Sequence, residues 1–147
     1  MVVTRTFDLL DRYKENLPKE DALCFKHNGA WVKYSSQEYI EYSYNFCYGL
    51  YELGLRKGDK IITVSTSRPE WNFIEMGMTM MGIVHVPVFA SLNASEYEYI
   101  IKDSGARMIL ISDAKLYKCV SQAIKNTGTS AIVYTLIKLK DYQTGWR

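Results

Sequence analysis

Histidine and cysteine are scarce in this sequence of 147 residues, and neither forms a cluster. His27 and His85 have no carboxylate or thiol nearby at metal-ligand spacing, and the apolar surroundings of His85 are typical of a buried, hydrogen-bonded histidine. Three scattered cysteines, Cys24, Cys47 and Cys119, indicate reduced thiols rather than a disulfide framework. The sequence therefore predicts no metal centre and no disulfide-linked secreted fold.

Glycine-rich phosphate-binding motifs are also missing. Gly49 and Gly54 share the first spacing of a G-x-x-x-x-G-K loop, as do Gly77 and Gly82, but lysine follows neither pair. The sequence contains no G-x-G-x-x-G and no G-x-S-x-G motif. These absences argue against a P-loop nucleotidase, a dinucleotide-binding domain and an α/β hydrolase.

Charge of one sign does not dominate. Eighteen basic and sixteen acidic residues leave a net charge of +2, so we expect no nucleic-acid partner. Charged residues near the start argue against a signal peptide, and the most apolar window, 73–92, is interrupted by polar residues and a proline. We therefore expect a cytoplasmic protein.

The stretch 60–111 predicts the fold class. It holds three short aliphatic runs, 61–65, 83–89 and 108–111, whose continuous apolar character is typical of parallel strands buried on both faces. Each gap is long enough for a helical crossover. With a further helix and a fourth strand at 131–136, we predict an α/β fold of order β-α-β-α-β-α-β, with helices on both faces of a mostly parallel sheet.

Capping patterns place the starts of the crossover helices. Ser67 with Glu70 and Ser95 with Glu98 each have the spacing of a capping box, and Asp113 is a cap for the helix 114–125. The first of these helices ends at Gly82. Because Gly77 and Gly82 have no side chain, we expect the helix to approach the sheet closely there.

A helix, a hairpin and a long amphipathic helix precede this unit. The helix covers 6–13, and strands 22–27 and 30–34 are joined by an Asn-Gly turn. The long helix begins at a capping box of Ser35 and Glu38 and ends at Gly54. Its predicted core face comprises Ile40, Tyr44, Cys47, Leu50 and Tyr51, with Tyr39, Tyr42 and Tyr48 on the flanks. The length suits a single α/β domain, 1–147.

The carboxyl ends of the strands are where ligands of open α/β sheets gather. Arg68 follows one strand and could hold an anion or lie in a surface loop. Phe89, Ser91 and Leu92 follow the next, and could wall an apolar pocket or face another domain. Met78 belongs to a methionine-rich helix and could be adaptable core filler or line an apolar channel.

Five ordered segments resemble one enzyme family. They read WVKYS from Trp31, LGLRKGDKI from Leu53, SRPEW from Ser67, GIVHVPVFASL from Gly82 and YIIKDSGARMIL from Tyr99. Their order and gaps over roughly residues 4–113 resemble the N-terminal subdomain of AMP-forming acyl-CoA synthetases, the adenylate-forming superfamily. RPEW and VPVFASL look most like long-chain fatty acid–CoA ligases. The tail after Leu136 matches nothing in this family pattern.

The resemblance implies a two-step reaction. A carboxylate attacks the α-phosphorus of ATP in the presence of Mg²⁺, giving an acyl-adenylate and pyrophosphate, and the thiol of coenzyme A then displaces AMP. The family's phosphate loop, metal-binding glutamate and ribose-binding aspartate have no counterpart here. We therefore assign no catalytic, cofactor-binding or metal residue, and we expect an inactive scaffold fragment whose partner is the remainder of the same polypeptide.

Two further expectations accompany this interpretation. Apolar surface left exposed on such a fragment predicts a homodimer, and a fatty acid substrate would bring the enzyme to the periphery of a membrane. The alternative hypothesis is a free-standing α/β binding or interaction module without catalysis.

Overall fold

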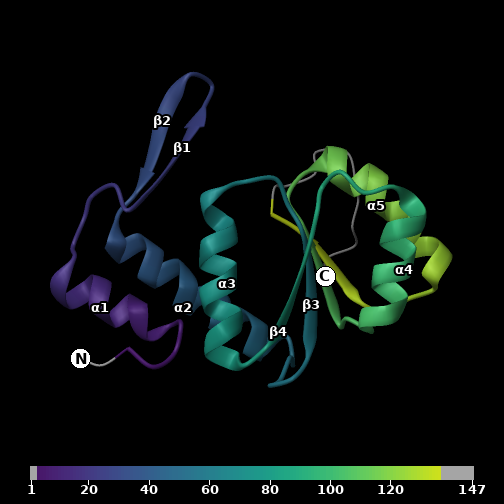
Figure 1. Cartoon of the computed structure of the whole chain (residues 1–147), viewed down its shortest axis with the longest axis horizontal. Helices are drawn as coiled ribbons and strands as arrows, with labels where there is room; N and C mark the ends of the chain where they lie inside the picture. The colour runs from purple at the N-terminus through teal and green to yellow at the C-terminus, as the bar shows by residue number, and fades with distance from the viewer. Residues whose placement is uncertain (1–2, 137–147) are drawn as a thin grey trace. The chain divides into compact units, whose positions relative to one another are not determined.

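The protein is described here by a computed structural model that covers residues 3–136 (Figure 1). The contacts within it divide the chain into two compact units. The first unit takes in Met1–Asp59 and Ser67–His85, and the second Lys60–Thr66 and Val86–Arg147. Whether they form one domain, as the chain length suggests, stays a prediction.

A four-stranded sheet of order β4-β3-β5-β6 forms the centre of the second unit. The strands are β3 (Lys60–Val64), β4 (Val84–Val88), β5 (Met108–Ile111) and β6 (Ile132–Thr135). β5 pairs in parallel with β3 on one side and β6 on the other, with Met108 opposite both Ile61 and Ile132. Every residue of β5 and all of β3 except Lys60 are buried, as expected of strands covered on both faces, whereas β4 and β6 are only partly buried.

Helices α4 (Ala94–Ser104) and α5 (Ala114–Thr127) lie side by side over one face of this sheet (Figure 1). Their apolar residues join those of the strands in one core, whose fully or nearly fully buried members include Ile62, Val64, Ile101, Ile109, Ile111 and Val120. β-branched strand residues therefore meet the apolar stripes of two amphipathic helices, as the sequence pattern predicts.

The first unit contains α1 (Asp8–Asn16), the hairpin strands β1 (Leu23–His27) and β2 (Ala30–Tyr34), α2 (Ser36–Glu52) and α3 (Pro69–Met81). Asn28 and Gly29 both have positive φ, as a two-residue hairpin turn requires, so the hairpin prediction is confirmed. One hydrophobic cluster of this unit comprises Leu10, Tyr39, Ile40, Phe73 and Met76.

The predicted close approach at Gly77 joins two helices rather than a helix and a strand. A Cβ placed on Gly77 would lie 2.8 Å from the carbonyl oxygen of Ser43 and 2.8 Å from the Phe46 ring, both on α2. The absence of a side chain lets the backbones of α2 and α3 pack closely. Gly82 ends α3 with a φ of 67°, which confirms its predicted role.

Two predicted capping boxes are wrong. α3 begins after Arg68, one residue later than predicted, and a guanidinium has no acceptor with which to cap a helix. The Glu70 carboxylate accepts hydrogen bonds from the Arg68 guanidinium instead. α4 begins two residues before the predicted start, since Asn93 and Glu96 form its capping box. The Asn93 side chain accepts hydrogen bonds from the Ser95 hydroxyl and the Glu96 amide. The capping box of Ser35 and Glu38 and the cap at Asp113 are confirmed.

The predicted core face of α2 is displaced by part of a turn. Its buried residues are Ser36, Tyr39, Ile40, Ser43 and Leu50, whereas Tyr44 and Tyr51 are exposed. Small serines mark the buried face, and the hydroxyl of Ser43 donates a 2.7 Å hydrogen bond to the carbonyl of Tyr39. The spacing of the tyrosines is compatible with either of two buried faces of α2. Packing against α3 favours the face that carries the small serine residues.

All three cysteines lie within the described part of the chain and are free thiols there. None of the helices between residues 3 and 136 has both the length and the apolar character needed to cross a bilayer.

Candidate functional site

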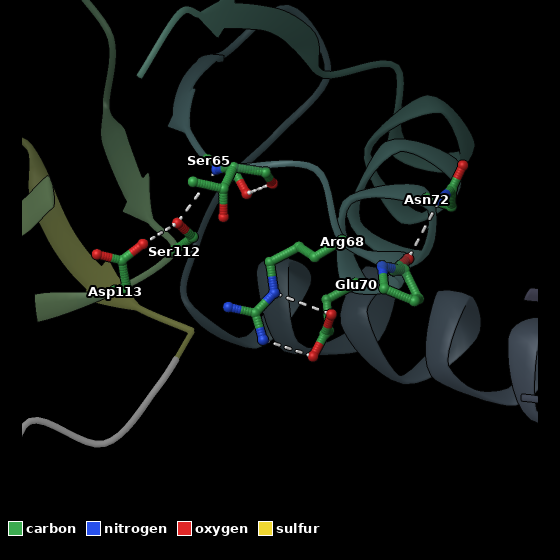
Figure 2. A network of polar contacts seen from close by, with 8 residues as sticks. Ser65, Arg68, Glu70, Asn72, Ser112 and Asp113 are labelled. Atoms are coloured by element: carbon green, nitrogen blue, oxygen red, sulfur yellow. Dashed lines mark hydrogen bonds and ion pairs between the residues drawn. The ribbon is translucent and has the colours of Figure 1, made fainter. Parts of the chain in front are cut away.

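Polar residues follow β3 and β5 at the carboxyl edge of the sheet in the second unit. The backbone N–H of Thr66 donates to the Ser112 hydroxyl at 3.3 Å, and that hydroxyl donates to the Asp113 carboxylate at 2.8 Å (Figure 2). The other carboxylate oxygen accepts from the backbone of Leu116 at 3.0 Å, which caps α5. These bonds connect the two strand ends to the start of α5, so this polar edge stabilises the sheet.

The loop after β4 carries three of the predicted site residues. The Phe89 side chain is 80% exposed, and its backbone carbonyl accepts a hydrogen bond from the buried Tyr97 hydroxyl at 3.0 Å. Ser91 is exposed, and Leu92 lines a shallow depression of about 400 Å³ together with Tyr99 and Ile100 of α4. The structure thus gathers an apolar surface near this loop, and its use as a substrate site stays a prediction.

Arg68 lies at the start of α3 in the first unit, where its guanidinium makes two hydrogen bonds to the Glu70 carboxylate, at 2.9 and 2.7 Å (Figure 2). Both side chains are partly buried. The guanidinium lowers the pKa of Glu70, while partial burial acts in the opposite direction. The sequence left two interpretations of Arg68 open: it could hold an anion or lie in a surface loop. An anion bound there would have to share the guanidinium with the Glu70 carboxylate.

Met78 is 0% exposed on α3 and is surrounded by the protein interior. Its neighbours Met76 and Gly77 are also buried, whereas Met80 and Met81 are half-buried. In this structure Met78 is therefore a packing residue, and a channel beside it would require the surrounding side chains to move. The predicted site residues thus fall into both units: Arg68 and Met78 in the first, and the Phe89–Leu92 loop in the second.

A pair of ionisable residues in the first unit escaped the sequence-based reasoning. Nδ1 of His85 contacts the carboxylate of Glu75, and the His85 ring packs against Trp71 with ring centroids 5.3 Å apart. The expectation of a satisfied histidine is confirmed, and its partner Glu75 was not indicated because it does not lie at metal-ligand spacing in the sequence. Ten residues and the end of α3 separate the pair, so only the turn after the helix brings them together.

ATP and Mg²⁺, which the family resemblance implies, find no matching residue set in the described chain. Between residues 3 and 136, no three His, Cys, Asp or Glu side chains come together in a way that could hold a metal ion. The sequence likewise has no phosphate-binding loop. We therefore attribute no step of nucleotide chemistry to a residue of this chain.

The family model for the AMP-binding enzyme matches residues 10–145, which is nearly the whole chain. The chain belongs to this family. The match includes the tail after Leu136, for which the sequence pattern gave no assignment, although that tail lies outside the described residues.

Curated relatives show the acyl-CoA synthetase character of the family. The chain is 30% identical over 124 residues to fatty acyl-CoA synthetase A of Dictyostelium discoideum, covering 80% of this chain and 19% of the relative. It is also 30% identical over 122 residues to crotonobetaine/carnitine–CoA ligase of Shigella flexneri, covering 83% of this chain and 23% of that protein. The chain thus spans about a fifth of the length of these relatives.

Solved structures share the fold. An anthranilate CoA ligase in complex with anthranoyl-AMP superimposes with a TM-score of 0.75 at 17% identity, over 92% of this chain and 25% of that one. This likeness confirms the predicted α/β fold.

Proposed function

We propose that this chain is the N-terminal part of an AMP-forming CoA ligase. The whole protein would activate a carboxylate with ATP to an acyl-adenylate and then transfer the acyl group to coenzyme A. The observation that carries the proposal is the match to the AMP-binding enzyme family over residues 10–145, supported by curated relatives that are acyl-CoA synthetases or CoA ligases.

For the acyl substrate we propose a long-chain fatty acid. The fatty acyl-CoA synthetase among the relatives supports this choice, as does the apolar surface of Phe89, Leu92 and Tyr99 in the second unit. The crotonobetaine/carnitine ligase, at the same identity, provides the competing substrate class: a short, polar carboxylate.

Within such an enzyme, we propose that this part is a scaffold, with the nucleotide chemistry supplied by residues elsewhere in the polypeptide. Its buried parallel sheet and tightly packed helix pair are suited to that structural role. A cytoplasmic location, peripheral membrane contact and a homodimer formed through the exposed apolar surface are further parts of this proposal.

Acid-dependent ATP–pyrophosphate exchange tests the proposal. The protein expressed from the full reading frame should catalyse exchange with palmitate at least tenfold faster than with carnitine or crotonobetaine, and should form palmitoyl-CoA. The 147-residue chain alone should show no exchange. A full-length protein without exchange for any acid would support the non-catalytic binding module instead, and a faster reaction with carnitine would overturn the long-chain assignment alone.

A further inference from the structure

A cavity of about 320 Å³, partly open to solvent, lies in the first unit between the end of α1 and the starts of β1 and α2. The chain that leaves α1 is fixed beside the start of α2 by three hydrogen bonds. The Ser36 amide donates to the Lys19 carbonyl at 2.8 Å, the Lys19 amide donates to the Ser36 hydroxyl at 3.1 Å, and this hydroxyl donates to the Leu17 carbonyl at 3.2 Å. The cavity wall is therefore preformed by backbone contacts.

Tyr39 is one of the residues that line this cavity. Its side chain is 7% exposed, and its ring packs against Tyr13 and Phe73. Its hydroxyl makes no hydrogen bond to any residue in the described chain. Every side-chain oxygen or nitrogen there that is closed to solvent has a hydrogen-bond partner, so the Tyr39 hydroxyl is accessible to solvent. Because Tyr39 lines the cavity, we infer that its hydroxyl is reached from the cavity. Burial raises the pKa of Tyr39 to about 12, so the hydroxyl remains a donor at neutral pH.

The other polar lining groups favour a negatively charged ligand. Lys19 is the single charged residue in the lining, and Asn72 adds a side-chain amide whose N–H makes only a long, 3.4 Å hydrogen bond to Pro69. The acidic side chain that acts electrostatically on Tyr39 is Glu75, which is paired with His85. Among the described residues that line the cavity, a ligand would thus meet hydrogen-bond donors and one basic residue, and no carboxylate.

The remaining wall is apolar, and the volume limits the size of the ligand. Leu17, Ala22 and Leu23 line it. At roughly 30 Å³ for each water-sized group, the cavity holds about ten non-hydrogen atoms, near the lower limit of small-molecule sites.

We propose that this cavity binds a small amphiphilic carboxylate of about ten non-hydrogen atoms. The carboxylate accepts hydrogen bonds from Tyr39 and Asn72 near the Lys19 ammonium group, and the hydrocarbon part lies against Leu17 and Leu23. The assignment rests on the cavity alone and does not depend on the proposed ligase function.

Titration calorimetry with octanoate, which has ten non-hydrogen atoms, tests this site on the full 147-residue chain. Tyr39→Phe keeps the ring but removes the donor, and should weaken binding about tenfold or more, because a hydrogen bond to a charged group is among the stronger ones. Tyr42→Phe, on the same helix but outside the lining, is the matched control and should bind as the unaltered chain does. 1-Octanol should bind at least tenfold more weakly than octanoate.

A second variant covers the case in which Tyr39→Phe disturbs folding, which near-ultraviolet circular dichroism would show. Ala22→Phe fills the cavity from its wall and should abolish octanoate binding while the circular dichroism spectrum is retained. Undetectable octanoate binding by the unaltered chain, equal binding by Tyr39→Phe, or equal affinity for 1-octanol would each overturn the proposal. Loss of ATP–pyrophosphate exchange in the full-length protein would leave it standing.

Discussion

The two units of this chain bury different kinds of side chain. In the first unit, Phe73 packs against the rings of Tyr34, Tyr39 and Tyr42 with centroids 5.2, 5.7 and 5.2 Å apart, and we call these four residues the aromatic core. In the second unit, Ile62, Val64, Ile109 and Ile111 of the strands form what we call the aliphatic core.

The difference matters because aliphatic and tyrosine side chains have different packing requirements. Aliphatic strand residues pack by volume and carry no polar atoms. Tyrosine rings need favourable ring geometry, and each hydroxyl must reach water or a hydrogen-bond partner. The aromatic core accordingly includes the half-exposed Tyr42 and lies beside a cavity, whereas Ile109 and Ile111 are completely buried. We infer that a core of tyrosine rings can leave an opening at its edge, whereas the depression of the second unit lies beside Leu92, Tyr99 and Ile100 and not within its aliphatic core.

The largest expected effect is the truncation of the aromatic core. Phe73→Ala should lower the free energy of unfolding by about 3–5 kcal/mol, because it removes a buried ring in contact with three others. Urea unfolding followed by far-ultraviolet circular dichroism measures it. Tyr48→Ala, at an exposed position on α2, is the control and should change stability by less than about 1 kcal/mol. A loss below 1 kcal/mol for Phe73→Ala would mean that the aromatic core does not hold the first unit together.

In the aliphatic core, Ile109→Ala should cost about 2–5 kcal/mol, since the side chain is 0% exposed in the central strand β5. The same unfolding measurement applies. Ile109→Val should cost only about 0.5–1.5 kcal/mol, because it deletes one methylene and keeps the β-branch. A cost for Ile109→Val equal to that of the alanine variant would contradict packing by volume in this core.

A glycine pair tests the close contact between α2 and α3. Gly77→Ala should destabilise the protein by about 1–3 kcal/mol, because the added Cβ would meet the Ser43 carbonyl at 2.8 Å. Gly49→Ala, in the interior of α2 with open space around it, should instead stabilise by about 0.5–1 kcal/mol through helix propensity. Differential scanning calorimetry measures both variants, and the same sign for both changes would refute the close helix contact.

Most of the second unit could be predicted from the sequence. Its strands are continuous aliphatic runs, and Asp113 and Gly128 mark the ends of α5 unambiguously. Even the hairpin of the first unit follows from its Asn-Gly turn. In these places a short stretch of chain decides its own conformation.

The buried face of the tyrosine-rich helix α2 is harder to predict, because two neighbouring faces of this helix carry similar residues. Tyr39 and Tyr44 both fit a helical stripe, and only contact with Phe73 and the close approach of Gly77 to Ser43 decide which is buried. The Glu75–His85 pair and the cavity beside Tyr39 arise in the same way, from segments distant in sequence. Of the candidate site residues, Phe89 and Leu92 lie in the loop after β4, as predicted, and their use as a substrate site stays a prediction. Of the two interpretations of Met78, core residue or channel lining, the structure shows a core residue.

The start of α4 permits a sharper test of local signals. Asn93→Ala should cost about 1 kcal/mol, since the Asn93 side chain accepts the 3.1 Å hydrogen bond from the Glu96 amide. Ser95→Ala should cost less than about 0.5 kcal/mol, because its hydroxyl only donates to Asn93. Thermal unfolding measures the stability of both variants. A larger loss of stability for Ser95→Ala than for Asn93→Ala would support Ser95 as the N-cap of α4, as the sequence pattern predicts.

The smallest expected effect concerns the ion pair at the start of α3. Arg68 lowers the pKa of Glu70 below its ordinary value of 4.5, so the folded state favours the ionised carboxylate. The pair therefore contributes stability above pH 4.5, and this contribution is lost as the pH falls through the lowered pKa of the folded state. Arg68→Met should cost about 0.5–1 kcal/mol at pH 7 and less at pH 3, where the Glu70 carboxylate is more protonated. Lys33→Met, which breaks the exposed pair with Asp21, is the control and should have no measurable effect at either pH. Urea unfolding at the two pH values provides the comparison, and a cost for Arg68→Met that is independent of pH would show that Arg68 acts through packing rather than through the charge of Glu70.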